Sequence, residues 1–299
     1  MMQNVLIIGC GLIGSSILRA IDKKKISKKI LVYDKSKKNI LKIKKLKLRC
    51  RVITDLKAVI PKLDLIIFCT PMSEYEKIIL KINKYLISKT VITDVGSSKE
   101  NSLLLIKKRL KKGISWTSSH PIAGSEVSGP EFGNENLFSN KWCILIKEQY
   151  SNRKQLTFLS KFWKKIGSKV AIMDAKKHDS IFSMTSHLPH LIAYNLIKTA
   201  IEFEKKKKYG LIKFSAGGLR DFSRIAASNE IMWRDIFFSN KKNLLKVIDL
   251  FIINLKSFKK DIKYKKNNAL IKKLSETKTV RKKILKLKQD VSKPDFGRN

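Results

Sequence analysis

The sequence is short of acidic residues and cysteines, and it has no long apolar run. Its 299 residues include only four cysteines, Cys10, Cys50, Cys69 and Cys143, none in a CxxC spacing. Cys10, Cys69 and Cys143 lie in apolar runs, so we interpret them as reduced core residues of a cytoplasmic protein, and we expect no metal site. No apolar run approaches the roughly 18 residues of a membrane span. The apolar start lacks a preceding basic residue, which argues against a signal peptide.

Acidic side chains are heavily outnumbered, since 65 Lys and Arg residues against 24 Asp and Glu give a net charge of +41. Such a charge is typical of nucleic-acid-binding proteins. However, only ten of the 65 are arginines, the side chain best suited to phosphate and base contacts, and the lysines are spread over the whole length. We therefore favour solvated lysines that attract small anionic substrates, and keep a basic nucleic-acid-binding protein as an alternative.

Short apolar runs alternate with helical patterns in the first half of the sequence. The runs at 5–8, 30–33, 65–68 and 91–93 predict buried parallel strands. Strand and helix in alternation predict a doubly wound, mostly parallel α/β sheet of the Rossmann type. We expect two further runs, at 142–146 and 170–172, to extend the same sheet.

The pattern changes at Asp174, where strand-like runs end and apolar residues recur at spacings of three and four. We therefore predict a Rossmann domain over residues 1–173 and an all-α domain over residues 174–299. The lysine-rich end is expected to be a helix followed by a frayed tail from Lys293.

A glycine motif follows the first predicted strand and begins a helical pattern, as in dinucleotide-binding folds. Its residues are Gly9, Cys10, Gly11, Leu12, Ile13 and Gly14. The three glycines permit a tight turn, a close approach to a pyrophosphate and close packing of helix on strand. The N-terminus of the helix then attracts the phosphates.

Asp34 ends the second predicted strand, twenty residues after Gly14. A carboxylate there hydrogen-bonds a ribose 2′-hydroxyl and repels a 2′-phosphate, so we predict NAD as cofactor. The neighbouring Lys35 keeps NADP as an alternative. Thr70 and Pro71 end the third strand, at the edge where such sheets bind ligands, and we expect them to contact the cofactor.

All four histidines fall between residues 120 and 190, behind this nucleotide-binding pattern. A dehydrogenase needs a base for a hydroxyl proton and cations for substrate carboxylates. A histidine in the polar segment around His120 and arginines in the segment around Arg224 meet both needs.

Five segments between residue 5 and about residue 240 together resemble the prephenate/arogenate (cyclohexadienyl) dehydrogenase family. They are GCGLIGSS, DVGSSK, SSHPIAGSE, TSHLPH and GGLRDFSRIAASNEIMWRDIF. The resemblance implies a homodimer built through the helical domain. It also implies oxidative decarboxylation of prephenate to 4-hydroxyphenylpyruvate in tyrosine biosynthesis, in which a hydride leaves for NAD, CO2 leaves and the ring becomes aromatic.

The same resemblance implies roles for individual residues. His120 is the base for the ring hydroxyl, Ser97 orients it, and Arg224 binds a substrate carboxylate. The other substrate-binding residues are His190, Ser186, Glu126, Gly218 and Trp233. His178 and His187 are expected to be structural.

Alternatives remain for the substrate and for the type of dehydrogenase. Arogenate differs from prephenate only in an amino group in place of a keto group, so oxidation of arogenate to tyrosine, or of both substrates, is the alternative. A hydroxy-acid dehydrogenase of the 6-phosphogluconate type shares the architecture, but it is expected to use a lysine base, against which the His120 and Arg224 segments argue. We expect neither a fused chorismate mutase nor a tyrosine-binding regulatory module.

Overall fold

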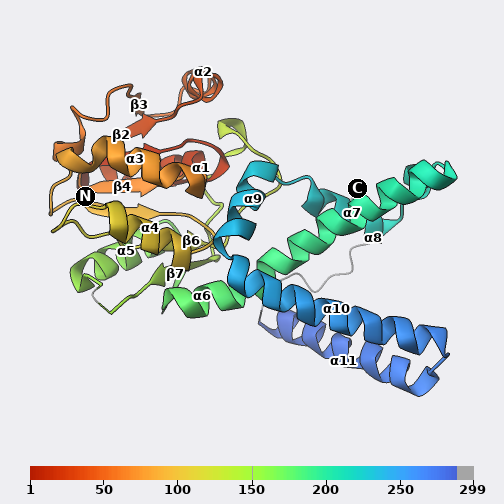
Figure 1. The fold of residues 1–299 in the computed structure, drawn as a ribbon. Coiled ribbons are helices and arrows are strands. Elements are labelled where there is room, and N and C mark those ends of the chain that lie inside the picture. Colours follow the sequence, from red (N-terminus) through yellow and green to blue (C-terminus); the bar gives the residue numbers. More distant parts are fainter. Residues whose placement is uncertain (150, 288–299) are drawn as a thin grey trace.

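The computed structural model describes residues 1–149 and 151–287 and consists of an α/β part and an elongated helical part (Figure 1). The predicted tail from Lys293 lies outside the described residues. Five parallel strands form the main sheet, in the order β3-β2-β1-β4-β5. They are β1 (Met2–Ile8), β2 (Ser27–Tyr33), β3 (Arg51–Val52), β4 (Leu65–Phe68) and β5 (Val91–Asp94).

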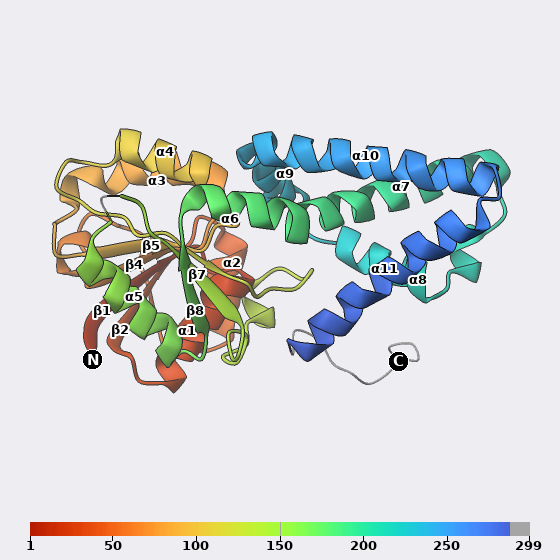
Figure 2. The ribbon, with the colours of Figure 1, turned by 90° about the horizontal axis from the view of Figure 1, so that it is seen from below.

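Both faces of this sheet are buried, which explains why its strands are continuous apolar runs. On β1, Val5 and Ile7 join one apolar core, and Leu6 and Ile8 join the other. Helices α1 (Leu12–Lys23), α2 (Lys37–Lys45) and α5 (Arg153–Lys165) cover the first face, and α3 (Tyr75–Ile82) and α4 (Glu100–Arg109) cover the second (Figure 2). The predicted Rossmann architecture is confirmed.

The prediction that residues 142–146 and 170–172 extend the same sheet is wrong. They form β7 (Trp142–Ile146) and β8 (Lys169–Met173), which together with β6 (Ser119–Pro121) make a separate three-stranded sheet. Between β5 and β6, hydrogen bonds made by side chains take the place of a backbone hydrogen-bond ladder. Ser119 Oγ donates to the carbonyl of Asp94 at 2.6 Å, and Lys99 Nζ donates to the carbonyl of Ser119 at 2.7 Å. The hydroxyls of Thr93 and Ser119 lie 3.0 Å apart across the same boundary, and an isolated bridge pairs Ile92 with Trp116.

The rest of the described chain is helical. Helix α6 (Ala175–Phe182) is capped by the side chain of Asp174, which accepts from the N–H of Lys177. A π-helical turn (Ser183–His187) connects α6 to α7 (Leu188–Lys207), and the three form one rod that leads away from the sheets (Figure 2). The remaining helices are α8 (Gly217–Ala226), α9 (Glu230–Ser239), α10 (Lys241–Lys263) and α11 (Asn267–Lys286). None of the helices described is long and apolar enough to cross a membrane.

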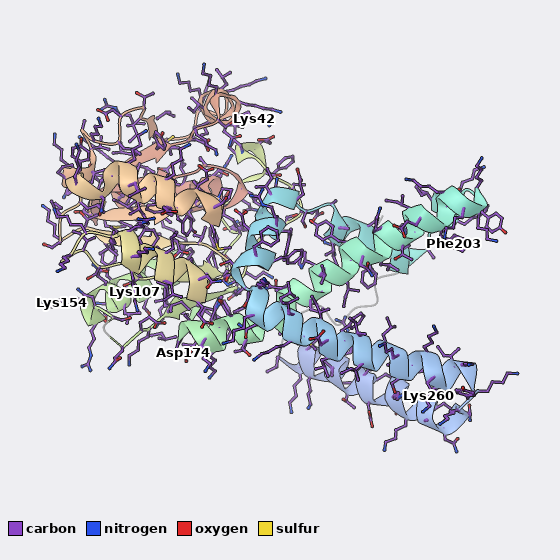
Figure 3. The ribbon with its side chains drawn as sticks, viewed as in Figure 1. Lys42, Lys107, Lys154, Asp174, Phe203 and Lys260 are labelled. Carbon is purple, nitrogen blue, oxygen red and sulfur yellow. The ribbon has the colours of Figure 1, made fainter. Side chains whose placement is uncertain are left out.

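The basic side chains are distributed over both parts of the molecule. Lys107 on α4 and Lys154 on α5 lie on the α/β part, and Lys260 on α10 lies on the helical part (Figure 3). All three are exposed, as expected for solvated lysines.

Candidate active site

The glycine motif forms the turn from β1 into α1. Gly9 has φ +88°, and a Cβ there would lie 2.8 Å from the carbonyl oxygen of Cys69. A Cβ on Gly14 would lie 2.1 Å from the carbonyl oxygen of Gly9, so only glycine lets α1 pack this closely on the turn. A Cβ on Gly11 would meet only open space. Gly11 is also the N-cap of α1, and no side chain among the described residues caps that helix.

Two polar groups beside this turn fit a bound dinucleotide. Asp34 follows β2 directly, and its carboxylate accepts from the N–H of Cys10 and of Ser36, each at 2.8 Å. The carboxylate is therefore held against the glycine turn. Thr70 follows β4, and its Oγ1 is buried without a hydrogen-bond partner among the described residues. A buried hydroxyl of this kind is available to bond a ligand. The open N-terminus of α1, Asp34 and Thr70 suit phosphate, ribose and amide groups respectively.

His120 lies where the two sheets separate. It is on β6, only 7% exposed, with its ring 4.8 Å from that of Phe182 on α6. Its Nδ1 is 2.8 Å from Nε2 of His178, also on α6. Burial, followed by the neighbouring His178 and Lys99, holds the pKa of His120 well below its usual range. His120 is therefore neutral near pH 7, as a base must be before it accepts a proton.

A buried ion pair anchors the strand that carries His120. Lys99 Nζ lies 2.6 Å from Asp94 Oδ2, and both side chains are fully buried. Tyr75 Oη donates to the same carboxylate at 3.3 Å, as does Trp116 Nε1 at 3.1 Å. The carboxyl end of β5 is thus tied to β6 through charged hydrogen bonds.

The helical part contributes a second group of side chains. His190 on α7 stacks on Trp233 of α9, with ring centres 3.8 Å apart. His190 Nδ1 donates to the carbonyl of Ser186 at 2.9 Å, which leaves its Nε2 as an acceptor. The buried Nε1 of Trp233 has no acceptor among the described residues. These groups can therefore bond a polar ligand.

One ion pair bridges the two parts of the molecule. Arg224 on α8 lies 3.5 Å from Glu126, which follows β6, and both side chains remain partly exposed. Hydrogen bonds within its own loop, from the backbone and from Ser125, lower the pKa of Glu126, with a smaller contribution from Arg224. Arg224 is therefore paired with a carboxylate that a substrate carboxylate can displace.

Two of the predicted site residues, Ser97 and Gly218, take part in none of the hydrogen bonds and ion pairs described above. Ser97 is half-buried in the loop after β5, and among the described residues no hydrogen bond joins it to His120. Gly218 is the second residue of α8, where it lines a surface hollow with Phe203, Tyr209 and Phe214.

His178 was expected to be structural, and Asp179 was not among the predicted site residues. The structure places His178 against His120, and Asp179 Oδ1 lies 2.8 Å from His178 Nδ1. The signal for this arrangement in the sequence is a His-Asp pair in the first helix after the last strand.

Two family models match the chain. A family model described as "Prephenate dehydrogenase, nucleotide-binding domain" matches residues 17–172, and one described as "Prephenate dehydrogenase, dimerization domain" matches residues 174–276. The chain belongs to the prephenate dehydrogenase family. Membership makes it an oxidoreductase with a nucleotide-binding domain.

Individual members of the prephenate dehydrogenase family are similar over most of the chain. The cyclohexadienyl dehydrogenase of Zymomonas mobilis is 33% identical over 96% of this chain and 97% of its own length. The prephenate dehydrogenase of Bacillus subtilis is 31% identical over 84% of this chain and 68% of its own length. A solved structure of A. aeolicus prephenate dehydrogenase in complex with hydroxyphenyl propionate and NAD+ matches with a TM-score of 0.87 and 33% identity, over 95% of this chain and 99% of that one.

Proposed function

We propose that the enzyme catalyses the oxidative decarboxylation of prephenate to 4-hydroxyphenylpyruvate with NAD. The observation that carries the proposal is a buried, neutral His120 at the junction of a nucleotide-binding sheet and a helical part that presents Arg224. Two relatives named for this family's dehydrogenase activities support it, at 33% and 31% identity.

The residues that would hold NAD are those of the glycine turn and the neighbouring strand ends. The N-terminus of α1 at Gly11 would bind the pyrophosphate, Asp34 the adenosine ribose, and Thr70 with Pro71 the part nearer the reaction. Asp34 favours NAD over NADP, because its carboxylate would repel a 2′-phosphate. Lys35, which could offset that repulsion, pairs instead with Glu74 at 2.8 Å. When bound, NAD supplies the acceptor for the hydride on the ring carbon that bears the hydroxyl.

The chain's own residues supply a base and an anion-binding group. His120 Nε2 accepts the proton of the ring hydroxyl while the carbon–oxygen double bond forms. The bond to the ring carboxylate then breaks, CO2 leaves, and its electron pair enters the ring. The ring becomes a phenol as the proton returns to oxygen. Arg224 binds a substrate carboxylate in place of Glu126, because a guanidinium matches that anion with two parallel hydrogen bonds.

Arogenate is the second candidate, favoured by similarity over 96% of the chain to a cyclohexadienyl dehydrogenase. The test is NADH formation with purified protein, offering prephenate and arogenate separately and repeating each assay with NADP. Turnover on prephenate with NAD supports the proposal, and turnover on arogenate alone replaces prephenate by arogenate. Binding of NAD without turnover of either substrate would falsify the substrate assignment.

We further propose that the chain is a homodimer formed through its helical part, divided from the Rossmann domain between residues 173 and 174. Large apolar side chains are exposed there, including Phe203 at 48%, Ile212 at 78% and Phe214 at 79%. Apolar surface of this kind is typical of a protein interface. Sedimentation velocity should give twice the mass of 34.4 kDa, and Phe214→Glu should shift the protein toward monomer. A monomeric wild-type protein at micromolar concentration would contradict the proposal.

A further inference from the structure

A continuous line of hydrogen bonds runs from the helical part to the base. Asp179 Oδ1 lies 2.8 Å from His178 Nδ1, and His178 Nε2 lies 2.8 Å from His120 Nδ1. His178 is 0% exposed and Asp179 is 1% exposed. Both lie on α6, which passes beside the smaller sheet that contains β6 (Figure 2).

Asp179 is an acceptor at the end of this line. Its carboxylate accepts from the N–H of Lys99 at 2.8 Å, from the N–H of Glu100 at 2.9 Å and from Ser98 Oγ at 3.1 Å. Burial alone would raise the pKa of Asp179, but the hydrogen bonds from His178 and from these backbone groups outweigh it, and the pKa is lowered. An ionised carboxylate has no proton to give, so Nδ1 of His178 carries the hydrogen in this pair.

The position of the hydrogen on His178 in turn determines its position on His120. Burial lowers the pKa of His178 despite its bond to Asp179, so the ring is neutral and its Nε2 is an acceptor. His120 Nδ1 must therefore be the donor. The hydrogen of a neutral imidazole sits on one nitrogen only, which leaves Nε2 of His120 with its lone pair.

We propose that His178 and Asp179 are positioning residues that hold His120 in the tautomer with hydrogen on Nδ1 and a lone pair on Nε2. The inference rests on the proposed function for its role in turnover, but the tautomer itself is a property of the protein alone. When the hydroxyl proton moves to Nε2, the charge formed on His120 faces a lone pair of His178, backed by the Asp179 carboxylate. The proton returns to the phenol oxygen at the end, so no further acid or base is required.

In the serine-protease triad a carboxylate orients the catalytic histidine in the same way, and its removal indicates how strongly kcat depends on the tautomer. Loss of the orienting carboxylate there lowers kcat about 10⁴-fold, because the histidine adopts the wrong tautomer. Here the group that touches the base is a neutral imidazole, so the loss of charge stabilisation is smaller. We expect a fall in kcat of about 100-fold when the acceptor is removed.

Two variants of His178 separate the hydrogen bond from packing. His178→Phe fills a similar volume without an acceptor. His178→Gln can place its amide oxygen near the position of Nε2 and so retain one. We expect His178→Phe to lower kcat about 100-fold with little change in the KM for substrate, and His178→Gln to recover at least about tenfold of that loss. A role in packing alone would favour the aromatic Phe over Gln.

The tautomer is measured directly by ¹⁵N NMR of histidine-labelled protein without substrate. The chain has four histidines, so the spectrum contains eight ring nitrogens, and single variants assign them. Wild type and His178→Gln should show His120 protonated at Nδ1, and His178→Phe should show hydrogen on Nε2 in a substantial fraction. His187→Gln is the matched control, because His187 is equally buried but bonds Asn240 instead, and it should leave the tautomer of His120 unchanged.

Hydrogen on Nε2 of His120 in the wild-type protein would overturn the inference, even if His178→Phe failed to fold. Equal turnover in His178→Phe and wild type would also overturn it. If wild type turned over neither prephenate nor arogenate but showed the expected tautomer, the proposed function would fail and the hydrogen-bond assignment would stand.

Discussion

Replacing Lys99 by methionine tests whether the buried ion pair below His120 holds the active site together. Lys99 and Asp94 are both fully buried, 2.6 Å apart, and Lys99 Nζ also donates to the carbonyl of Ser119 at 2.7 Å. Methionine would fill most of the volume but leave the Asp94 charge without its cation and the Ser119 carbonyl without a donor. Removing one partner of a buried pair costs about 3–5 kcal/mol.

This loss converts to a shift in melting temperature. At roughly 2.1 cal/mol/K per residue, 299 residues give an unfolding entropy of about 0.6 kcal/mol/K, so Lys99→Met should lower Tm by about 5–8 °C. Calorimetry or circular dichroism measures this change in Tm. Lys107→Met is the matched control, because Lys107 is exposed on α4, the helix that begins directly after Lys99, and should change stability by less than about 0.5 kcal/mol.

The same variant has a second readout at the base. The charge of Lys99 helps to lower the pKa of His120, after burial and His178, so removing it should raise that pKa. The acid limb of kcat/KM should then move to higher pH. Asp94→Asn combined with Lys99→Met should be less destabilised than the two single changes added together, because no unpaired charge remains. A Tm within about 1 °C of wild type, together with an unmoved acid limb, would refute the reasoning.

Three further predictions follow from the site. His120→Asn should lower kcat by about 10²–10⁴-fold while the Kd for NAD, from fluorescence titration, stays nearly constant, and unchanged turnover would remove His120 from the mechanism. Arg224→Ala should raise the KM for substrate about 10- to 100-fold, through loss of charged hydrogen bonds worth about 1.5–3 kcal/mol, and an equal rise for NAD would instead indicate a structural role. Burial lowers the pKa of His187 to about 4, so its contribution to stability is present above about pH 6.5 and is lost as pH falls toward 4. Urea unfolding at pH 7 and pH 4.5 should show that loss, and His187→Gln should make it smaller.

The main-sheet strands and the glycine turn of the nucleotide-binding half could be predicted from short stretches of sequence. A strand buried on both faces, such as Leu65–Phe68, is a continuous apolar run, and that is visible in any sequence. The glycine turn is equally local, because the positive φ of Gly9 and the close packing of Gly14 arise within six residues. The change from strands to helices after Met173 follows in the same way from a change of periodicity.

Contacts between distant segments were not visible in the sequence. The runs Trp142–Ile146 and Lys169–Met173 have the apolar pattern of the main sheet, but whether they join it depends on pairing with β5. Side chains of Lys99 and Ser119 occupy the boundary between β5 and β6, from positions 23 or more residues before β7 by the bounds of the elements. His178 likewise has an ordinary helical environment in the sequence, and its partner is 58 residues away along the chain.

The break between the two sheets and the position of the base have a common cause. If β6 continued the ladder of β5, its backbone groups would be bonded by a neighbouring strand and there would be no place for Lys99 Nζ between them. Lys99 and Ser119 supply hydrogen bonds on the side of β6 that faces β5, so β6 has a ladder only on its other edge, with β7, and carries His120 toward α6. There His178 can reach its Nδ1. Loss of the Lys99 ammonium should therefore weaken the fold and disturb the base together, whereas a change at His178 should disturb the base with much less effect on the fold.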